Sequence, residues 1–194
     1  MIYQILGLIV FILGCAHLLP AIKPLDTRIV LTLQSRFRNK PWLPFFQEIW
    51  FFGRTSFAVI TIVLLISLNW KLGSTALVIF LIIVGIEQIV KMVFNRARPY
   101  TSDAEITMLQ PISPHDPSFP SGDALRIWYL ALILPIATGN SSLFLAATLL
   151  LAILVTLGRI VMGVHYLTDT FAGSGLGILG AGTTLWLWHL LNLL

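Results

Sequence analysis

The sequence predicts an all-α, polytopic membrane protein in which about six transmembrane helices form one compact domain over residues 1–194. Composition is the first reason, because the chain is 57% hydrophobic and only 10% charged, whereas an ordinary soluble domain is about 45–50% apolar and roughly 25% charged. Repeated apolar runs are the second, since about 20 such residues cross the hydrocarbon core of a bilayer. We therefore expect lipid to be the solvent of this chain.

Six apolar stretches are expected to form the spans, with glycine or proline between them. The first lacks the basic segment with which a cleaved signal peptide begins, so we expect it to remain as a membrane helix. The second is expected to extend backwards through residues 45–52. The spans cover residues 2–19, 55–70, 74–94, 124–138, 142–162 and 166–191, and the breaks fall at Pro20, Gly53, Gly73, Gly139-Asn140 and Gly163.

Two connections and one glycine-rich span complete this organisation. Residues 99–120 are polar and rich in proline. Residues 175–180 spell G-x-G-x-x-G, which indicates a dinucleotide site only after a strand; inside an apolar helix it favours close packing through small residues. Residues 21–54 mix basic and large apolar side chains, which is typical of an amphipathic segment at the lipid head groups. Its basic residues include Lys23, Arg28, Arg36, Arg38 and Lys40.

The net charge of +4 does not indicate a nucleic-acid partner. The basic residues lie between apolar runs and not in a soluble patch interleaved with aromatic side chains. Lipid head groups or phosphate are the partners that this distribution favours. The single cysteine, Cys15, excludes an intramolecular disulfide.

Ionisable residues beside membrane spans are costly, so each one is a hypothesis about function. They gather in three clusters: residues 91–98 at the end of the third span, 119–123 at the start of the fourth, and 159–169 where the fifth meets the sixth. Two crossings separate the second cluster from the third and return the chain to its starting side. We therefore expect all three clusters at one face of the membrane.

Three cations in these clusters favour phosphate binding. Lys91 and Arg98 are seven residues apart, about two helical turns, and can share a helix face. They would repel each other unless an anion lay between them, and Arg159 adds a third positive charge. Guanidinium groups bind phosphate oxygens in a bidentate manner, and lysine adds a point charge. The alternatives are snorkelling surface charges and, for Lys91, a structural pair with Glu87.

Pro120-Ser121-Gly122 precedes an apolar run and looks like the start of a helix. Ser121 can cap that helix, and Gly122 lets another group approach the backbone. The free N–H groups and the positive end of the helix dipole would then seat an anion. A turn without a ligand explains this tripeptide equally well when it is taken alone.

His165 and Asp169 are four residues apart, which predicts one helix face and a hydrogen bond between them. A carboxylate on one ring nitrogen fixes the tautomer and leaves the other nitrogen free to attack. A structural histidine is the alternative, and it is the better interpretation of His17 and His189, which have no acid nearby. The combination of His165 with Asp169 and Arg159 favours a catalytic role for His165.

Taken together, Lys91-x6-Arg98-Pro99, Pro120-Ser121-Gly122 and Arg159-x5-His165-x3-Asp169 resemble the three-part signature of the type 2 phosphatidic acid phosphatase superfamily. The resemblance covers residues 91–169, and the flanking spans are similar to the family's six-helix membrane core. It implies that the phosphate ligands are Lys91, Arg98, Ser121, Gly122 and Arg159.

The resemblance also implies that His165 is the nucleophile that forms a phosphohistidine, that Asp169 orients it, and that no metal ion or other cofactor is needed. One position departs from the family pattern: the second motif normally ends in a histidine that protonates the leaving group, and here Asp123 stands there. An ordinary aspartate has a pKa of about 3.9 and is ionised at neutral pH. Burial that raises the pKa of Asp123, proton transfer by His115, and a leaving group that needs little help are the competing explanations.

We favour the third explanation, because the leaving group of a lipid diphosphate is a phosphate whose second pKa is about 6. The sequence thus predicts a lipid phosphatase for an isoprenoid diphosphate such as undecaprenyl diphosphate, ahead of phosphatidic acid or phosphatidylglycerophosphate. Two alternatives stay open: a lipid phosphotransferase that uses the same residues, and a catalytically impaired relative that binds or moves phospholipid.

We expect the protein in the plasma membrane of a prokaryote. All of the 12 Lys and Arg residues except Lys71 are predicted on the side of the three clusters, and the positive-inside rule would place that side in the cytoplasm. The family resemblance more often implies the outer face. Basic residues that bind anionic lipids would also be counted by the positive-inside rule, although they do not report orientation. We therefore follow the family resemblance and expect the three clusters at the extracytoplasmic face.

Overall fold

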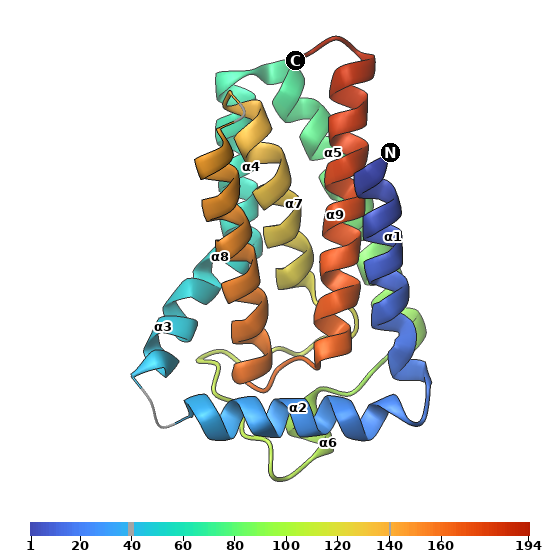
Figure 1. Cartoon of the computed structure of the whole chain (residues 1–194), viewed down its shortest axis with the longest axis vertical. Helices are drawn as coiled ribbons and strands as arrows, with labels where there is room; N and C mark the ends of the chain where they lie inside the picture. Colours follow the sequence, from blue (N-terminus) through green and yellow to red (C-terminus); the bar gives the residue numbers. More distant parts are fainter. Residues whose placement is uncertain (39–40, 140) are drawn as a thin grey trace.

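The computed structural model describes residues 1–38, 41–139 and 141–194; Lys40 of the expected interfacial segment and Asn140 of the expected fourth break lie outside this part of the chain. The described residues are helical and contain no strand. In Figure 1 the long helices run side by side, and α2 crosses one end of the bundle. The helices are α1 (Ile2–Gly14), α2 (Ile22–Phe37), α3 (Trp42–Ile49), α4 (Thr55–Leu68), α5 (Trp70–Phe94), α6 (Pro99–Ser102), α7 (Gly122–Ala137), α8 (Ser142–Val161) and α9 (Leu167–Leu190), with the short 3-10 helices η1 (Cys15–Leu18) and η2 (Trp50–Gly53).

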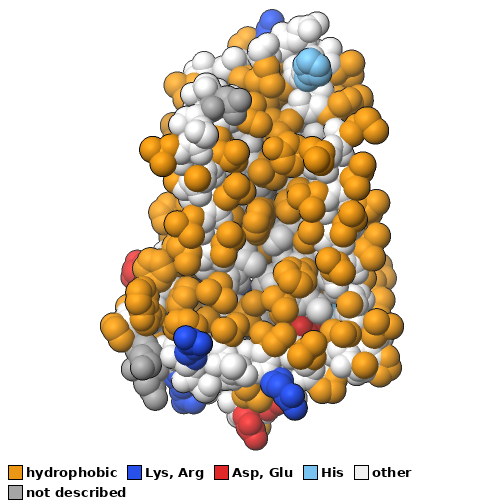
Figure 2. All heavy atoms as spheres, viewed as in Figure 1, with side chains coloured by type: hydrophobic (Ala, Val, Ile, Leu, Met, Phe, Trp, Pro, Cys, Tyr) orange, Lys and Arg blue, Asp and Glu red, His pale blue; other side chains and the backbone are white. Residues whose placement is uncertain are grey.

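The apolar helices support a membrane protein, although the expected six spans are not confirmed. Two segments of the described chain, Trp70–Ser102 and Ser142–Val161, are long and apolar enough to cross a membrane. Two bent helix pairs, Ile2–Leu18 with Ile22–Phe37 and Trp42–Gly53 with Thr55–Leu68, raise the count to four if each pair is one span. Figure 2 shows hydrophobic side chains covering the side of the bundle, whereas most of the charged side chains in view lie towards its lower end, which α2 crosses.

α7 is the inner helix of the bundle. It packs against α4, α5, α8 and α9, and eleven of its 16 residues are buried. A helix enclosed in this way contacts lipid little, so it can carry charged residues in its first turn. Its N-terminus therefore presents Gly122 and Asp123 to the inside of the protein.

Close helix packing through glycine is confirmed for the sixth apolar stretch. A Cβ atom added to Gly175 of α9 would lie 2.3 Å from the main-chain nitrogen of Phe11 in α1, and one added to Gly7 of α1 would lie 2.5 Å from that of Leu179. Only glycine lets the two backbones approach so closely. The expected break at Gly73 is wrong, because α5 begins at Trp70, where the side chain of Asn69 caps it.

α2 lies across the end of the bundle at which α8 ends and α9 begins. The side-chain amide of Gln34 donates to the main-chain oxygens of Thr107 and Val161. Lys23, Arg28 and Arg36 are exposed, whereas Asp26 is 1% exposed and faces the bundle. This distribution of charged and buried residues agrees with the amphipathic segment expected there.

Candidate active site

A cavity of about 210 Å³ lies at the end of the bundle that α2 crosses, and residues from all three sequence clusters line it. The fold thus brings together helix ends that are up to 74 positions apart in the sequence, from Lys91 to His165. The predicted residues in its lining are Lys91, Arg98, Gly122, Asp123, Arg159 and His165. Ser121 and Asp169 are not part of the lining but lie buried behind it.

Lys91 and Arg98 do not share a helix face, so that expectation is wrong. α5 ends at Phe94 because Asn95 adopts the left-handed conformation, with φ of 40°. Both side chains nevertheless converge on Asp116: Arg98 Nη2 lies 2.8 Å from its carboxylate, and Lys91 Nζ contacts the other oxygen. Lys91 also pairs with Glu87 at 2.8 Å.

Asp116 is the anion between the two cations, and sequence reasoning missed it. Burial raises the pKa of this carboxyl group, but the hydrogen bond and charge of Lys91 and the charge of Arg98 outweigh that effect and lower the pKa to about 2. The carboxylate is therefore ionised at neutral pH. The repulsion expected between Lys91 and Arg98 was the only sequence signal that an anion belongs here.

Asp123 is held in its ionised form by its neighbours. Its carboxylate pairs with Arg126 Nη2 at 2.6 Å and with Arg159 Nε at 2.8 Å, and it accepts a hydrogen bond of 3.2 Å from the indole N–H of Trp50. Two guanidinium groups oppose protonation of this carboxylate. His115 lines a neighbouring cavity and not the one that contains His165.

Arg159 carries one buried donor, Nη1, that has neither a hydrogen bond nor an ion pair within the described part of the chain. The side chain is 2% exposed, and its Nε already faces the carboxylate of Asp123 at 2.8 Å. The guanidinium group lies over the ring of Trp50, 5.2 Å from the centroid. Buried donors are rarely left without an acceptor, so the cavity is suited to an anion that supplies one.

The start of α7 forms the floor of the cavity. The hydroxyl oxygen of Ser121 accepts from the main-chain N–H of Ala124 at 3.4 Å, which makes Ser121 the N-cap. A Cβ atom added to Gly122 would lie 2.4 Å from a carboxylate oxygen of Glu87 and 2.8 Å from Arg126 Nη1. Any larger residue here would therefore displace the charged ends of Glu87 and Arg126.

His165 lies between α8 and α9, in the loop that precedes Leu167, so its expected position on one helix face with Asp169 is wrong. Its Nδ1 lies 2.8 Å from the main-chain oxygen of Ser118 and 3.7 Å from the carboxylate of Asp169, and the second distance is too long for a hydrogen bond. Its Nε2 faces the cavity, 3.3 Å from Arg98 Nη1. Burial, followed by the charge of Arg98, lowers the pKa of His165 to about 4.

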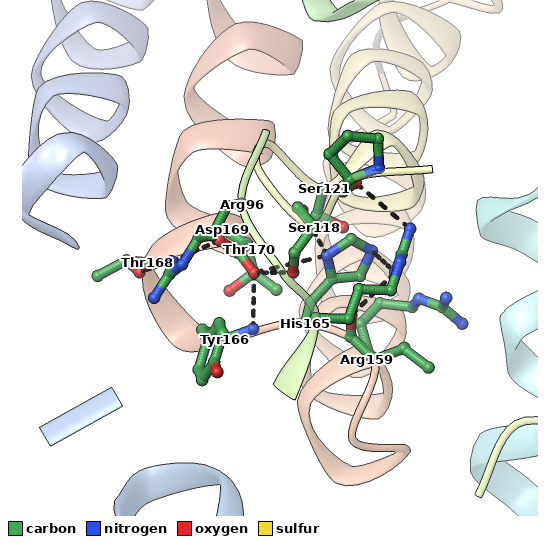
Figure 3. A network of polar contacts seen from close by, with 12 residues as sticks. Arg96, Ser118, Ser121, Arg159, His165, Tyr166, Thr168, Asp169 and Thr170 are labelled. Carbon is green, nitrogen blue, oxygen red and sulfur yellow. Dashed lines mark hydrogen bonds and ion pairs between the residues drawn. The ribbon is translucent and has the colours of Figure 1, made fainter. Parts of the chain in front are cut away.

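Asp169 is fully buried and is connected to His165 through Ser118 (Figure 3). Its carboxylate accepts hydrogen bonds from the hydroxyl group of Ser118 and from the main-chain N–H of Tyr166, the latter at 2.8 Å. It also pairs with Arg96 at 2.6 Å. Sequence reasoning placed Arg96 in the first cluster without giving it a role. The residues around the site that it missed include Asp26, Trp50, Asp116, Ser118 and Arg126.

No group of three or more His, Cys, Asp or Glu side chains that could hold a metal ion occurs within residues 1–38, 41–139 and 141–194. Four cations and two carboxylates are among the residues that line the cavity: Lys91, Arg98, Arg126 and Arg159, with Asp116 and Asp123. Such a donor set suits an anion, since guanidinium and ammonium groups donate hydrogen bonds and cannot ligate a metal ion.

Comparisons with known proteins agree with the fold and with the sequence clusters. Residues 70–192 match the family model described as the PAP2 superfamily. Undecaprenyl-diphosphatase of Sulfolobus acidocaldarius is 30% identical over 149 residues, which cover 77% of this chain and 64% of that protein. The chain therefore spans less than two thirds of the length of this curated relative.

Two crystal structures share the fold. The first transmembrane PAP2 type phosphatidylglycerolphosphate phosphatase from Bacillus subtilis aligns with a TM-score of 0.83 and 21% identity over 97% of both chains. Aquifex aeolicus LpxE aligns with a TM-score of 0.72 and 23% identity over 82% of this chain and 93% of its own. At these identities the likeness concerns the fold alone.

Proposed function

Since the chain belongs to the PAP2 superfamily, we propose that it is an integral-membrane lipid phosphatase in which His165 attacks the phosphoryl group. The observation that carries this proposal is the guanidinium group of Arg159, whose buried Nη1 lacks a partner in the cavity that His165 lines. Lys91 and Arg98 face the same space. A phosphoryl group placed there would meet three cations and a nucleophile at once.

The tautomer of His165 supports attack by Nε2. The main-chain oxygen of Ser118 can only accept a hydrogen bond, so Nδ1 carries the proton. The guanidinium group of Arg98 can only donate, so Nε2 carries the lone pair. In the first step Nε2 forms a bond to phosphorus as the bond to the leaving oxygen breaks; in the second, water attacks phosphorus and releases inorganic phosphate from the imidazole.

A diphosphate is the substrate class that the surroundings of Asp123 favour. Its pairs with Arg126 and Arg159 keep this carboxylate ionised, so it has no proton to give to a leaving alkoxide. A leaving phosphate needs no such proton, because its charge is stable in water and Arg126 lines the same cavity. The undecaprenyl-diphosphatase of Sulfolobus acidocaldarius, 30% identical, adds support for an isoprenoid diphosphate.

We also propose that the protein lies in the prokaryotic plasma membrane with its cavity at the extracytoplasmic face. Lys71 and Lys91 lie near opposite ends of α5, and the exposed basic residues of α2 lie at the end that holds the cavity. Anionic lipid head groups account for this basic surface at either face of the membrane. Labelling of single cysteines introduced into residues 99–120, in a Cys15→Ser background, by a membrane-impermeant reagent added to intact cells tests the proposed side.

Phosphate release by the purified protein in detergent tests the proposed function. The panel contains an isoprenoid diphosphate, the matching monophosphate, phosphatidic acid and phosphatidylglycerophosphate. We expect the diphosphate to turn over fastest and His165→Ala to abolish turnover, whereas His189→Ala, an exposed histidine at the other end of α9, retains it. Activity that survives His165→Ala contradicts the proposal.

The same assay separates the alternative functions. Release of phosphate only when a second lipid is supplied, with the phosphoryl group recovered on that lipid, would identify a phosphotransferase. Binding of substrate without release of phosphate would identify an impaired relative. Asp123 is the residue that keeps this last alternative under test, because it lines the cavity where the family signature normally has a histidine that protonates the leaving group.

A further inference from the structure

A second polar network lies behind the cavity and is centred on Arg96. The two terminal nitrogens of its guanidinium group bind different carboxylates: Nη1 lies 2.6 Å from Asp169, and Nη2 lies 2.8 Å from Asp26. Its flat face lies over the ring of Tyr166, 4.0 Å from the centroid. Arg96 does not line the cavity that contains His165, so it cannot serve as one of the phosphate ligands.

Asp26 connects this network to α2. The carboxylate is 1% exposed and accepts hydrogen bonds from the main-chain N–H of Thr168, at 3.2 Å, and from the hydroxyl group of Thr168. Thr168 lies in the first turn of α9, one residue before Asp169. A buried carboxylate on the helix that crosses the end of the bundle is thus bound to the helix start that carries Asp169.

The network reaches the imidazole through Ser118. Its hydroxyl group donates to Asp169, and its main-chain oxygen accepts from Nδ1 of His165. Asp26 accepts a hydrogen bond from Arg96. From Arg96 the hydrogen-bonded path continues through Asp169 and Ser118 to the ring of His165 (Figure 3). Each of these side chains is mostly buried, where little water competes for their donors and acceptors.

We propose that Asp26 and Arg96 are positioning residues for His165. Neither touches the cavity; they hold Asp169 and Ser118 so that the imidazole keeps its proton on Nδ1 and directs Nε2 at phosphorus. The fork of Arg96 is essential to this role, because its two terminal nitrogens each bind one carboxylate while its flat face lies over Tyr166. The single nitrogen of a lysine cannot keep this planar arrangement. This inference rests on the proposed function and adds to it that α2 takes part in aligning the nucleophile.

Two conservative variants test this role in the intact chain. Asp26→Asn keeps the shape of the side chain and removes its charge, and Arg96→Lys keeps the charge and removes the fork. The matched controls are Glu105→Gln and Arg28→Lys, which change exposed residues. For each protein we would measure kcat and KM on the lipid diphosphate, the inhibition constant of inorganic phosphate, and the thermal unfolding temperature.

The expected result is a loss of kcat without a loss of phosphate binding. Misplacement of a reacting group by about 1 Å can cost on the order of 10²-fold in rate, so we expect kcat of both variants to fall by roughly that factor. The inhibition constant of inorganic phosphate should stay within about twofold, because Lys91, Arg98 and Arg159 are unchanged. The two control variants should keep both constants.

Three results would overturn the inference. Unchanged kcat in both variants, with His165→Ala inactive, removes the positioning role and leaves the proposed function intact. A parallel loss of kcat and of phosphate binding shows that the pair merely supports the fold. A wild-type protein without phosphatase activity overturns the proposed function and this inference with it. If Asp26→Asn does not fold, Thr168→Val, which removes one hydroxyl group of the network, provides the same comparison.

Discussion

The Nδ1 atom of His165 lies 2.8 Å from the main-chain oxygen of Ser118. A main-chain oxygen is always an acceptor, so this contact sets the tautomer at every pH at which the imidazole is neutral. Asp169, which the sequence places as the direct partner, instead holds the hydroxyl group of the same serine. The orientation of the proposed nucleophile therefore depends on a loop residue that no pattern in the sequence indicates.

The pH dependence of kcat/KM should report the lowered pKa of His165. Burial and the charge of Arg98 bring this pKa from its ordinary value of 6.5 to about 4, so the nucleophile stays unprotonated in mildly acidic solution. We expect the acidic limb of the kcat/KM profile near pH 4 on the diphosphate. A limb near pH 6.5 would show that the ring is solvated in the free protein.

The same shift has a defined sign for stability. Between pH 4 and 6.5 the unfolded chain binds more protons at His165 than the folded protein does. The contribution of this group to the free energy of unfolding is therefore complete above pH 6.5 and is lost as the pH falls towards 4. Thermal unfolding of wild type and His165→Ala across this range measures the difference.

Replacement of Arg159 by lysine should weaken both phosphate binding and turnover. A lysine retains one charge but cannot both replace the pair of Nε with Asp123 and supply the donor Nη1 that now lacks a partner. A charge-assisted hydrogen bond contributes about 1.5–3 kcal/mol, so we expect kcat/KM to fall by roughly 10- to 100-fold. Arg36→Lys, an exposed substitution on α2, is the control, and an equal effect of the two variants would contradict the assignment.

Asp116→Asn should tighten the binding of inorganic phosphate. The carboxylate now neutralises Lys91 and Arg98, and a phosphate must compete with it for the same donors. The side chain of Asp116 is 45% exposed, and exposed pairs contribute at most about 1 kcal/mol, so we expect the inhibition constant to fall by up to about fivefold. Weaker binding in this variant, with Asp103→Asn unchanged, would show that Asp116 organises the cavity and does not compete in it.

Asp123→Asn should retain most of the turnover on a lipid diphosphate. Loss of a required general acid costs about 10²–10⁴-fold, and we expect a loss of less than about tenfold, because an ionised Asp123 is not that acid. Asp123→His, which restores the residue usual at this position, should instead raise the rate on the monophosphate relative to the diphosphate. A collapse of diphosphate turnover in Asp123→Asn ends the explanation based on the leaving group.

Apolar runs and their breaks predicted the long helices because both depend on local sequence. The expected boundaries of α8 and α9 differ from the observed ones by one residue at each end or less. Counting crossings also predicted that Lys91, Asp123 and His165 lie at one end of the bundle, and all three line one cavity. Enclosure of α7 could not be predicted in this way, because it depends on which helices surround it.

Contacts between distant segments account for what the sequence did not indicate. Asp26 and Arg96 are 70 positions apart, and their pairing depends on how α2 crosses the bundle. The four-residue spacing of His165 and Asp169 was misleading because α9 begins after His165. The seven-residue spacing of Lys91 and Arg98 was misleading for a similar reason, because the left-handed backbone of Asn95 ends α5 before Arg98. The sequence spacings therefore predicted which residues lie close together, but not how their side chains are oriented.

The place of α2 at the cavity end of the bundle has a consequence for how a lipid would reach the protein. Gln34 and Asp26 fasten this helix beside the cavity, at the level where an amphipathic helix meets the head groups. A lipid could then offer its terminal phosphate while its hydrocarbon tail stays among its neighbours in the bilayer. The protein and the lipid would then meet by diffusion within the plane of the membrane. Turnover would depend on the mole fraction of substrate in the membrane and not on the volume of the surrounding buffer.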